Sequence, residues 1–163
     1  MKQLKITMKE ISEINFPQKN ILIIGHPASG KTSLALLLKQ ENHTVFHSDD
    51  YQKHGFKESL YELMKDLERT EGGVIVEGIL GYRLLRKGLE TGKYFPDVVI
   101  EIVVDAQTIE ERYRKERDPS KLKGVFSLCK SCEKVLRDYK LMPNENIPDW
   151  IRVRSQDGKF EII

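Results

Sequence analysis

The sequence predicts a three-layer α/β domain in which helices cover both faces of a mostly parallel sheet. Three observations predict this class. Short runs of apolar, β-branched residues recur along the chain, as expected of strands that are buried on both faces. Segments with apolar residues at helical spacing separate these runs, and strands that alternate with helices form parallel sheets. The first run, Ile21-Leu22-Ile23-Ile24, leads directly into a glycine-rich loop and a helical segment.

The apolar runs predict a five-stranded sheet, with strands at residues 21–24, 44–46, 74–76, 98–104 and 151–154. Helical spacing of apolar residues predicts the intervening helices, at residues 31–38, 56–67, 82–87, 109–113 and 125–139. Leu34, Leu36, Leu37 and Leu38 mark the first of these as a buried helix. Asp157-Gly158 predicts a hairpin turn into a last strand at 160–163. Residues 1–19, where Leu4, Ile6 and Met8 alternate with polar residues, form an N-terminal extension with a short strand.

The length and composition of the chain favour an ordinary globular protein. Its 163 residues fit one domain, residues 1–163, and 39% of them are hydrophobic and 32% charged. The formal net charge of +2 gives no electrostatic argument for nucleic-acid binding. No apolar run approaches the roughly 20 residues that span a bilayer, and no signal peptide is evident. Because two cysteines cannot build a disulfide framework, we expect a cytoplasmic protein. Because no membrane-spanning run is present in the sequence, we expect no membrane partner.

A phosphate-binding loop follows the first predicted strand. Residues 25–32, Gly-His-Pro-Ala-Ser-Gly-Lys-Thr, fit G-x-x-x-x-G-K-[ST] at every fixed position. Glycines let such a loop fold tightly, so that backbone N–H groups and the following helix dipole converge on phosphate oxygens. Lys31 can reach the β- and γ-phosphates, and the Thr32 hydroxyl can ligate Mg²⁺. The nucleotide-binding residues predicted here are Gly25, Pro27, Ala28, Ser29, Gly30, Lys31, Thr32 and Ser33.

Carboxylates follow two of the predicted strands. Asp49 and Asp50 come after the second strand, where ligands bind in open α/β sheets. One of them can take the proton of an attacking hydroxyl, and the other can support Mg²⁺ through water. Helix capping is the structural alternative, since aspartate favours such positions. Glu77 ends the third strand beside the loop, and the predicted metal-supporting residues are therefore Thr32, Asp50 and Glu77.

These motifs together resemble the P-loop kinase superfamily, which includes uridine, adenylate and polynucleotide kinases. Glu77-Gly78-Ile79-Leu80 resembles a run of the uridine kinases. Ser48-Asp49-Asp50-Tyr51 is similar to the aspartate segment of uridine kinases and of 5′-hydroxyl polynucleotide kinases. The resemblance covers roughly residues 20–155 and implies a P-loop nucleotide kinase fold, ATP as donor and Asp49 as catalytic base. The chain departs from uridine kinases in having only one helix between Asp50 and the third strand, where those enzymes carry a larger acceptor-binding insertion.

A short lid is predicted at residues 112–125. Arg114-x-x-Arg117-Asp118 resembles the start of a kinase lid, whose arginines close over the transferred phosphate. The resemblance implies the catalytic set Lys31, Asp49, Arg114 and Arg117. Acidic residues interleave with these arginines, so the alternative to a lid is an ordinary solvated helix face. The sequence leaves open which arginine contacts the transferred phosphate.

The leading interpretation is an ATP-dependent kinase that phosphorylates a hydroxyl of a small acceptor, a nucleoside or related metabolite. A 5′-hydroxyl polynucleotide kinase is one alternative, because the short segment after Asp50 would leave an open groove; the absence of an evident basic stripe argues against nucleic acid. A nucleotide-binding switch or sensor without catalysis is the other alternative. Cys129 and Cys132 are interpreted as core residues, since a zinc site needs four ligands. The sequence leaves the acceptor and the oligomeric state open.

Overall fold

The computed structural model describes residues 20–26, 29–39, 43–51, 55–78, 80–94, 96–116, 134, 137, 148–156 and 159–163. Three predicted features therefore lie wholly or mostly outside the described residues. These are the N-terminal extension at 1–19, the part of the lid at 117–125 and, apart from two helical positions, the helix at 125–139.

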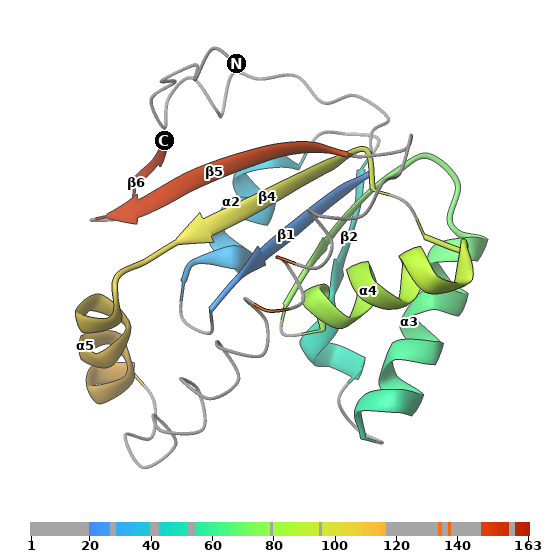
Figure 1. The fold of residues 1–163 in the computed structure, drawn as a ribbon, viewed down its shortest axis with the longest axis horizontal. Helices are drawn as coiled ribbons and strands as arrows, with labels where there is room; N and C mark the ends of the chain where they lie inside the picture. Colours follow the sequence, from blue (N-terminus) through green and yellow to red (C-terminus); the bar gives the residue numbers. More distant parts are fainter. Residues whose placement is uncertain are drawn as a thin grey trace.

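A six-stranded sheet with the order β2-β3-β1-β4-β5-β6 forms the centre of the fold (Figure 1). The strands are β1 (Ile21–Gly25), β2 (His43–His47), β3 (Gly73–Glu77), β4 (Val98–Val103), β5 (Asp149–Gln156) and β6 (Lys159–Ile162). The first five pair in parallel, as their burial and their intervening helices require. The sheet has one strand more than predicted, because the expected hairpin arm, β6, pairs antiparallel with β5 and buries Phe160 and Ile162.

Helices cover both faces of this sheet and give the predicted three layers. On one face lies α2 (Lys31–Leu38), and on the other lie α3 (Phe56–Arg69) and α4 (Gly81–Thr91). The helix α5 (Ala106–Glu116) follows β4, and a short 3₁₀ helix, η1 (Ser48–Tyr51), follows β2. Alternate residues of β1 serve the two cores, since successive strand residues point to opposite faces. Ile21 and Ile23 pack with α2, whereas Leu22 and Ile24 pack with α3 and α4, which lie side by side in Figure 1.

Helix α2 buries a narrower face than the leucine run suggested. Leu34 and Leu38 are buried, but Leu36 is 60% and Leu37 41% exposed, so the prediction that all four leucines mark a buried helix was wrong. The reason is helical geometry: at 3.6 residues per turn, Leu34, Ala35 and Leu38 lie on one side of the helix, and Leu36 and Leu37 turn toward the other side. Within the described part of the chain, no helix is both long and apolar enough to cross a membrane.

The start of helix α5 supplies a stability prediction. The Thr108 backbone N–H donates to Asp105 Oδ1 at 2.8 Å, and this hydrogen bond lowers the pKa of the Asp105 carboxyl. A lowered folded-state pKa means that the ionised cap stabilises the fold at neutral pH and that this contribution is lost as the pH falls through the folded-state pKa. Asp105→Ala is expected to lower Tm at pH 7, by a margin that shrinks below about pH 4. Asp105→Asn, which keeps a hydrogen-bond acceptor, is the control. If the loss of Tm in Asp105→Ala were the same at every pH in thermal melts, the ionised Asp105 carboxylate would not be the stabilising cap.

Candidate active site

The phosphate-binding loop joins β1 to α2, at the carboxyl edge of the sheet. Both of its fixed glycines are required by local geometry. A Cβ at Gly25 would lie 2.6 Å from Ser29 Oγ, and a Cβ at Gly30 would lie 3.2 Å from Phe160 Cζ. Gly30 also has a φ of 97°, in the left-handed region that favours glycine. Helix α2 begins at Lys31, as predicted, whereas Pro27 and Ala28 lie outside the described residues.

Hydrogen-bond donors lie close together at the start of α2. Lys31 is buried, and its Nζ donates to the carbonyl oxygens of Gly25 at 3.0 Å and His26 at 2.9 Å. Ser29 Oγ is also buried and has no hydrogen-bond partner among the described residues. The N-cap of α2 is Gly30, which has no side chain to cap the first-turn N–H groups. An ammonium, a buried hydroxyl and a helix N-terminus at one place fit the phosphate groups of a nucleotide.

The predicted metal-supporting residues Thr32 and Glu77 are in contact. Thr32 Oγ1 donates to Glu77 Oε1 at 3.1 Å, and Glu77 is 3% exposed. The strand register explains the contact, because Glu77 is paired with Ile23, whose side chain points to the α2 face. Two oxygen ligands beside a phosphate-binding loop fit Mg²⁺, which uses few protein ligands together with phosphate oxygens and water. The described residues hold no group of three or more His, Cys, Asp and Glu side chains that could bind a metal.

His47 lies against the same carboxylate, a contact that sequence reasoning missed. Its Nδ1 is 2.5 Å from Glu77 Oε1, and the two residues are paired in the register of β2 and β3. The sequence could have predicted this contact, because His47 and Glu77 are each the last residue of a strand and the ends of neighbouring parallel strands lie side by side. His47 therefore helps to hold the carboxylate that would meet the metal.

The aspartate segment is anchored to the end of β3 through Ser48 and Gly78. Ser48 is fully buried, and its Oγ accepts the backbone N–H of Leu80 at 3.0 Å. Gly78 has a φ of 122°, and a Cβ on it would lie 2.1 Å from Ser48 Oγ and 3.0 Å from Asp49 Oδ1. The Asp49 carboxylate thus lies against the residue that follows Glu77. The structure brings Asp49, Glu77 and Thr32 to one edge, and both Asp49 and Asp50 are exposed on η1.

Tyr51 closes η1 onto the neighbouring helix. Its hydroxyl donates to Asp66 Oδ2 of α3 at 2.5 Å. Partial burial, together with this hydrogen bond, raises the pKa of the Tyr51 hydroxyl above its ordinary value, so it stays a proton donor. The contact fixes η1, and therefore Asp49, relative to α3.

The arginines of α5 have different surroundings. Arg114 is exposed and pairs with Glu110 on its own helix, the arrangement expected of a solvated face, and Arg117 lies outside the described residues. Arg112 is half-buried, and its Nη2 lies 3.5 Å from Ser155 Oγ. That hydroxyl is 3.6 Å from where a Cβ at Gly30 would stand, so Arg112 reaches toward the phosphate-binding loop.

The helical spacing of α5 could have singled out Arg112. It follows the buried Ile109 by three residues and precedes the buried Tyr113, whereas Arg114 is turned away from that face.

Comparisons with known proteins establish the fold. No protein-family model matches the sequence, and no curated protein matches it. A gluconokinase from Sinorhizobium meliloti 1021 is similar in structure, with a TM-score of 0.54 and 13% identity over 84% of this chain and 82% of that one. The shikimate kinase from Acinetobacter baumannii, in complex with shikimate, gives a TM-score of 0.55 and 17% identity over 90% of this chain and 89% of that one. These likenesses confirm the predicted P-loop kinase fold.

Proposed function

We propose that the chain is an ATP-dependent kinase that transfers the γ-phosphoryl group of ATP–Mg²⁺ to a hydroxyl of a small acceptor, a nucleoside or related metabolite. One observation carries this proposal. The phosphate-binding loop, the Thr32–Glu77 pair and the Asp49 carboxylate lie at one edge of the sheet, with 3.1 Å between Thr32 Oγ1 and Glu77 Oε1 and with Asp49 against Gly78. A kinase needs these three elements together: a phosphate cradle, a metal site and a base. The low cysteine count fits a cytoplasmic setting for the reaction.

Each group has a role in an in-line transfer. The backbone N–H groups of the loop hold the β- and γ-phosphates. The Lys31 ammonium joins them by exchanging its hydrogen bonds to the carbonyl oxygens of Gly25 and His26 for bonds to phosphate oxygens. Thr32 and Glu77 would hold Mg²⁺, with Asp50 supporting it through water, and the ion would neutralise charge on the phosphate oxygens. Asp49 takes the proton as the acceptor oxygen bonds to the γ-phosphorus and the bond to the β-phosphate oxygen breaks, releasing ADP.

Cations from α5 complete the proposed site. Negative charge that develops on the transferred group is best stabilised by fixed positive groups. Arg114 and Arg117 keep their predicted role in this proposal. Arg112 joins them as a candidate, because it reaches Ser155 beside Gly30.

A screen of acceptors tests the proposal. Protein is incubated with γ-labelled ATP, Mg²⁺ and separate pools of nucleosides, nucleotides, small sugars and a 5′-hydroxyl oligonucleotide. We expect label on the acceptors of at least one pool. Tight ATP binding without transfer to any pool would contradict the kinase proposal and favour a nucleotide-dependent switch.

Magnesium dependence tests the role of Glu77. Glu77→Gln removes the charge but keeps the shape of the side chain, so we expect the Mg²⁺ concentration for half-maximal transfer to rise about 10- to 100-fold. Glu101→Gln is the control, since Glu101 is another carboxylate on a central strand, partly buried where Glu77 is buried, and pairs with Trp150 and Arg152. Equal Mg²⁺ curves for Glu77→Gln and the control would remove Glu77 from the metal site.

A further inference from the structure

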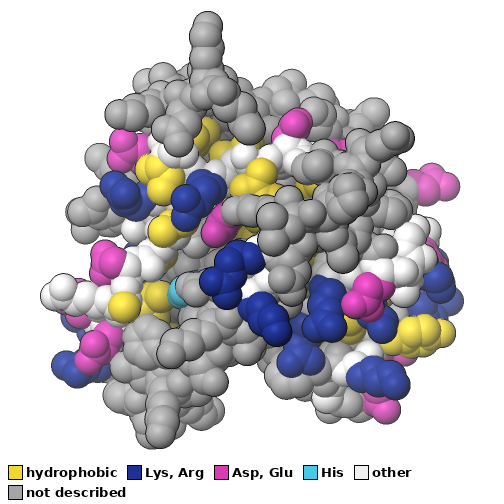
Figure 2. Space-filling view, viewed as in Figure 1, with side chains coloured by type: hydrophobic (Ala, Val, Ile, Leu, Met, Phe, Trp, Pro, Cys, Tyr) yellow, Lys and Arg dark blue, Asp and Glu magenta, His cyan; other side chains and the backbone are white. Residues whose placement is uncertain are grey.

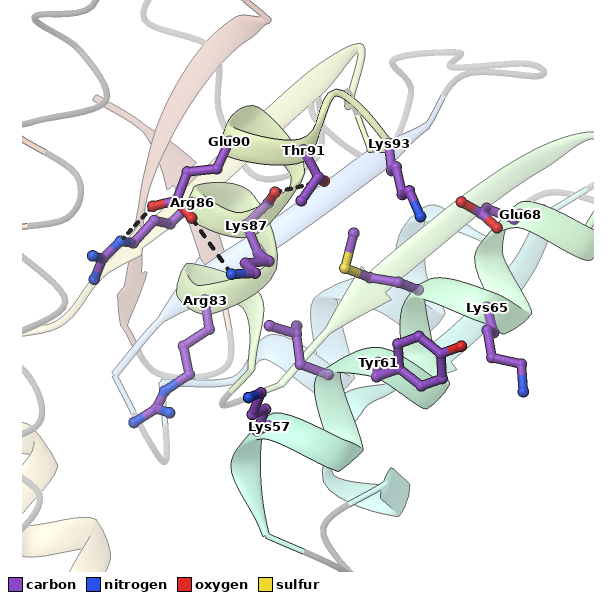
Figure 3. A pocket seen from close by; sticks show the side chains of 12 residues that line it. Lys57, Tyr61, Lys65, Glu68, Arg83, Arg86, Lys87, Glu90, Thr91 and Lys93 are labelled. Carbon is purple, nitrogen blue, oxygen red and sulfur yellow. Dashed lines mark hydrogen bonds and ion pairs between the residues drawn. The ribbon is translucent and has the colours of Figure 1, made fainter.

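A basic groove lies between α3 and α4, away from the loop that would hold ATP. Its volume is about 480 Å³. Figure 3 shows the side chains that line it. Leu60 and Met64 provide apolar surface, and Tyr61, 61% exposed, stands at one side. The cations that line the groove come from both helices and from the residues after α4: Lys57, Lys65, Arg83, Arg86, Lys87 and Lys93.

The positive charge of this groove is not balanced by its own acids. Six cations stand against the two carboxylates of Glu68 and Glu90. Glu90 already serves two partners, Arg86 at 3.2 Å and Lys87 at 3.7 Å. The whole chain carries only +2, so the groove has an excess of positive charge while the remaining residues are together net negative. Figure 2 shows Lys and Arg side chains gathered over this part of the surface.

Solvated lysines that cover apolar surface are the ordinary explanation of such a face. Two features favour a binding site instead. The cations stand on facing walls of one groove, where their mutual repulsion would be relieved by a bound anion. Arg83, Arg86 and Lys87 also follow helical i, i+3, i+4 spacing, which aligns them on one side of α4.

The groove begins at the edge that carries the candidate catalytic groups. Lys57 lies in the first turn of α3, which follows the aspartate segment, and Arg83 lies in the first turn of α4, which follows Gly78. The Tyr51–Asp66 hydrogen bond ties that segment to α3. Both helices start after the carboxyl ends of parallel strands, so the end of the groove that Lys57 and Arg83 line is the end nearer to the aspartate segment.

We propose that this groove binds the phosphate groups of the acceptor, so that the acceptor is a nucleotide with a free hydroxyl directed at Asp49. The inference rests on the proposed kinase function. A volume near 480 Å³ is in the range of about 300–1,000 Å³ typical of small-ligand sites. Arginine binds phosphate through a bidentate fork. Lys65 Nζ lies over one face of the Tyr61 ring, 5.4 Å from its centroid, and the other face of this exposed ring offers a stacking surface for a base. From Arg83 to Lys93 the cations extend over about 15 Å, enough to contact more than one phosphate. The same phosphate chemistry is available in a free nucleotide and at the 5′ end of a single strand.

Binding measured by calorimetry without ATP tests the groove separately from catalysis. The probes are a nucleoside, its 3′-monophosphate, and a tetranucleotide with a free 5′-hydroxyl. The 3′-monophosphate is expected to bind about tenfold more tightly than the nucleoside at low salt, with the advantage falling as KCl is added. If the tetranucleotide binds more tightly than the 3′-monophosphate, the acceptor phosphates belong to a strand end. If the two probes bind with equal affinity, the acceptor is a free nucleotide.

Charge reversal locates the site. Lys57→Glu/Lys87→Glu changes one cation on each wall, and we expect it to abolish the tenfold preference for phosphate. Lys39→Glu/Lys115→Glu is the matched control, because it changes the net charge equally at exposed positions outside the groove. Circular dichroism melts check that both variants fold. No preference for phosphate in the wild type, or an equal loss in the control, would overturn the inference.

The two proposals fail in different ways. Phosphoryl transfer to nucleosides without any preference for phosphorylated acceptors would refute the groove and leave the kinase standing. Groove-dependent binding of phosphorylated probes without transfer would refute the kinase and leave the anion site.

Discussion

Asp49→Ala is expected to lower kcat for phosphoryl transfer by about 10²- to 10⁴-fold, the usual contribution of a general base. The affinity for ATP should change little, because Asp49 faces Gly78 rather than the phosphate-binding loop. Steady-state kinetics on the acceptor found by the screen, together with a calorimetric measurement of ATP binding, would separate the two effects.

Asp50→Ala is the internal control for that experiment. Asp50 is the adjacent carboxylate on the same short helix and is exposed. We expect this change to raise the Mg²⁺ requirement while leaving kcat at saturating Mg²⁺ much less affected than in Asp49→Ala. If Asp50→Ala abolished transfer and Asp49→Ala did not, the assignment of the base would be reversed.

Gly78→Ala is expected to destabilise the fold by about 3 kcal/mol and to reduce transfer as well. The added Cβ would lie 2.1 Å from Ser48 Oγ, and the φ of 122° is unfavourable for alanine. Relief of the clash requires movement of the Ser48–Asp49 segment, which breaks the hydrogen bond from Leu80 and displaces the proposed base. Urea denaturation gives the free energy of unfolding, and kinetics on the folded fraction give the effect on activity.

Gly92→Ala separates backbone strain from the clash. Gly92 also has a positive φ, 68°, but a Cβ there would meet nothing within 4 Å. This variant should cost only about 1–2 kcal/mol, the strain of a left-handed residue, and should leave kcat unchanged. Equal costs at the two glycines would show that close packing against Ser48 contributes nothing.

The predictable parts of the fold were those determined by local sequence. The strand at Ile21–Gly25, the loop and the helix starting at Lys31 are contiguous, so their order alone predicts the phosphate-binding geometry. The alternation of buried strands and helices likewise predicted the parallel sheet. The strand count was one short, because the sequence predicted the hairpin arm but not its pairing as part of the sheet.

Contacts between distant segments could not be predicted in the same way. The pairing of His47 with Glu77 and the hydrogen bond from Leu80 to Ser48 depend on the register of β2 against β3. The sequence shows no evident basic stripe, although the structure brings cations together in one groove. Acidic residues interleave in the sequence, but α3 and α4 place cations from two segments on facing walls.

The proposed function requires that the loop and the ends of β2 and β3 form one phosphoryl-transfer site. The most direct measurement follows label from ATP to the identified acceptor, with ATP labelled in parallel at the γ- or the α-phosphate, for the wild type and for Lys31→Met. We expect only the γ-label to reach the acceptor, and we expect Lys31→Met to transfer almost none of it. Release of the γ-label only as inorganic phosphate, or undiminished transfer by Lys31→Met, would show that these groups do not form a phosphoryl-transfer site.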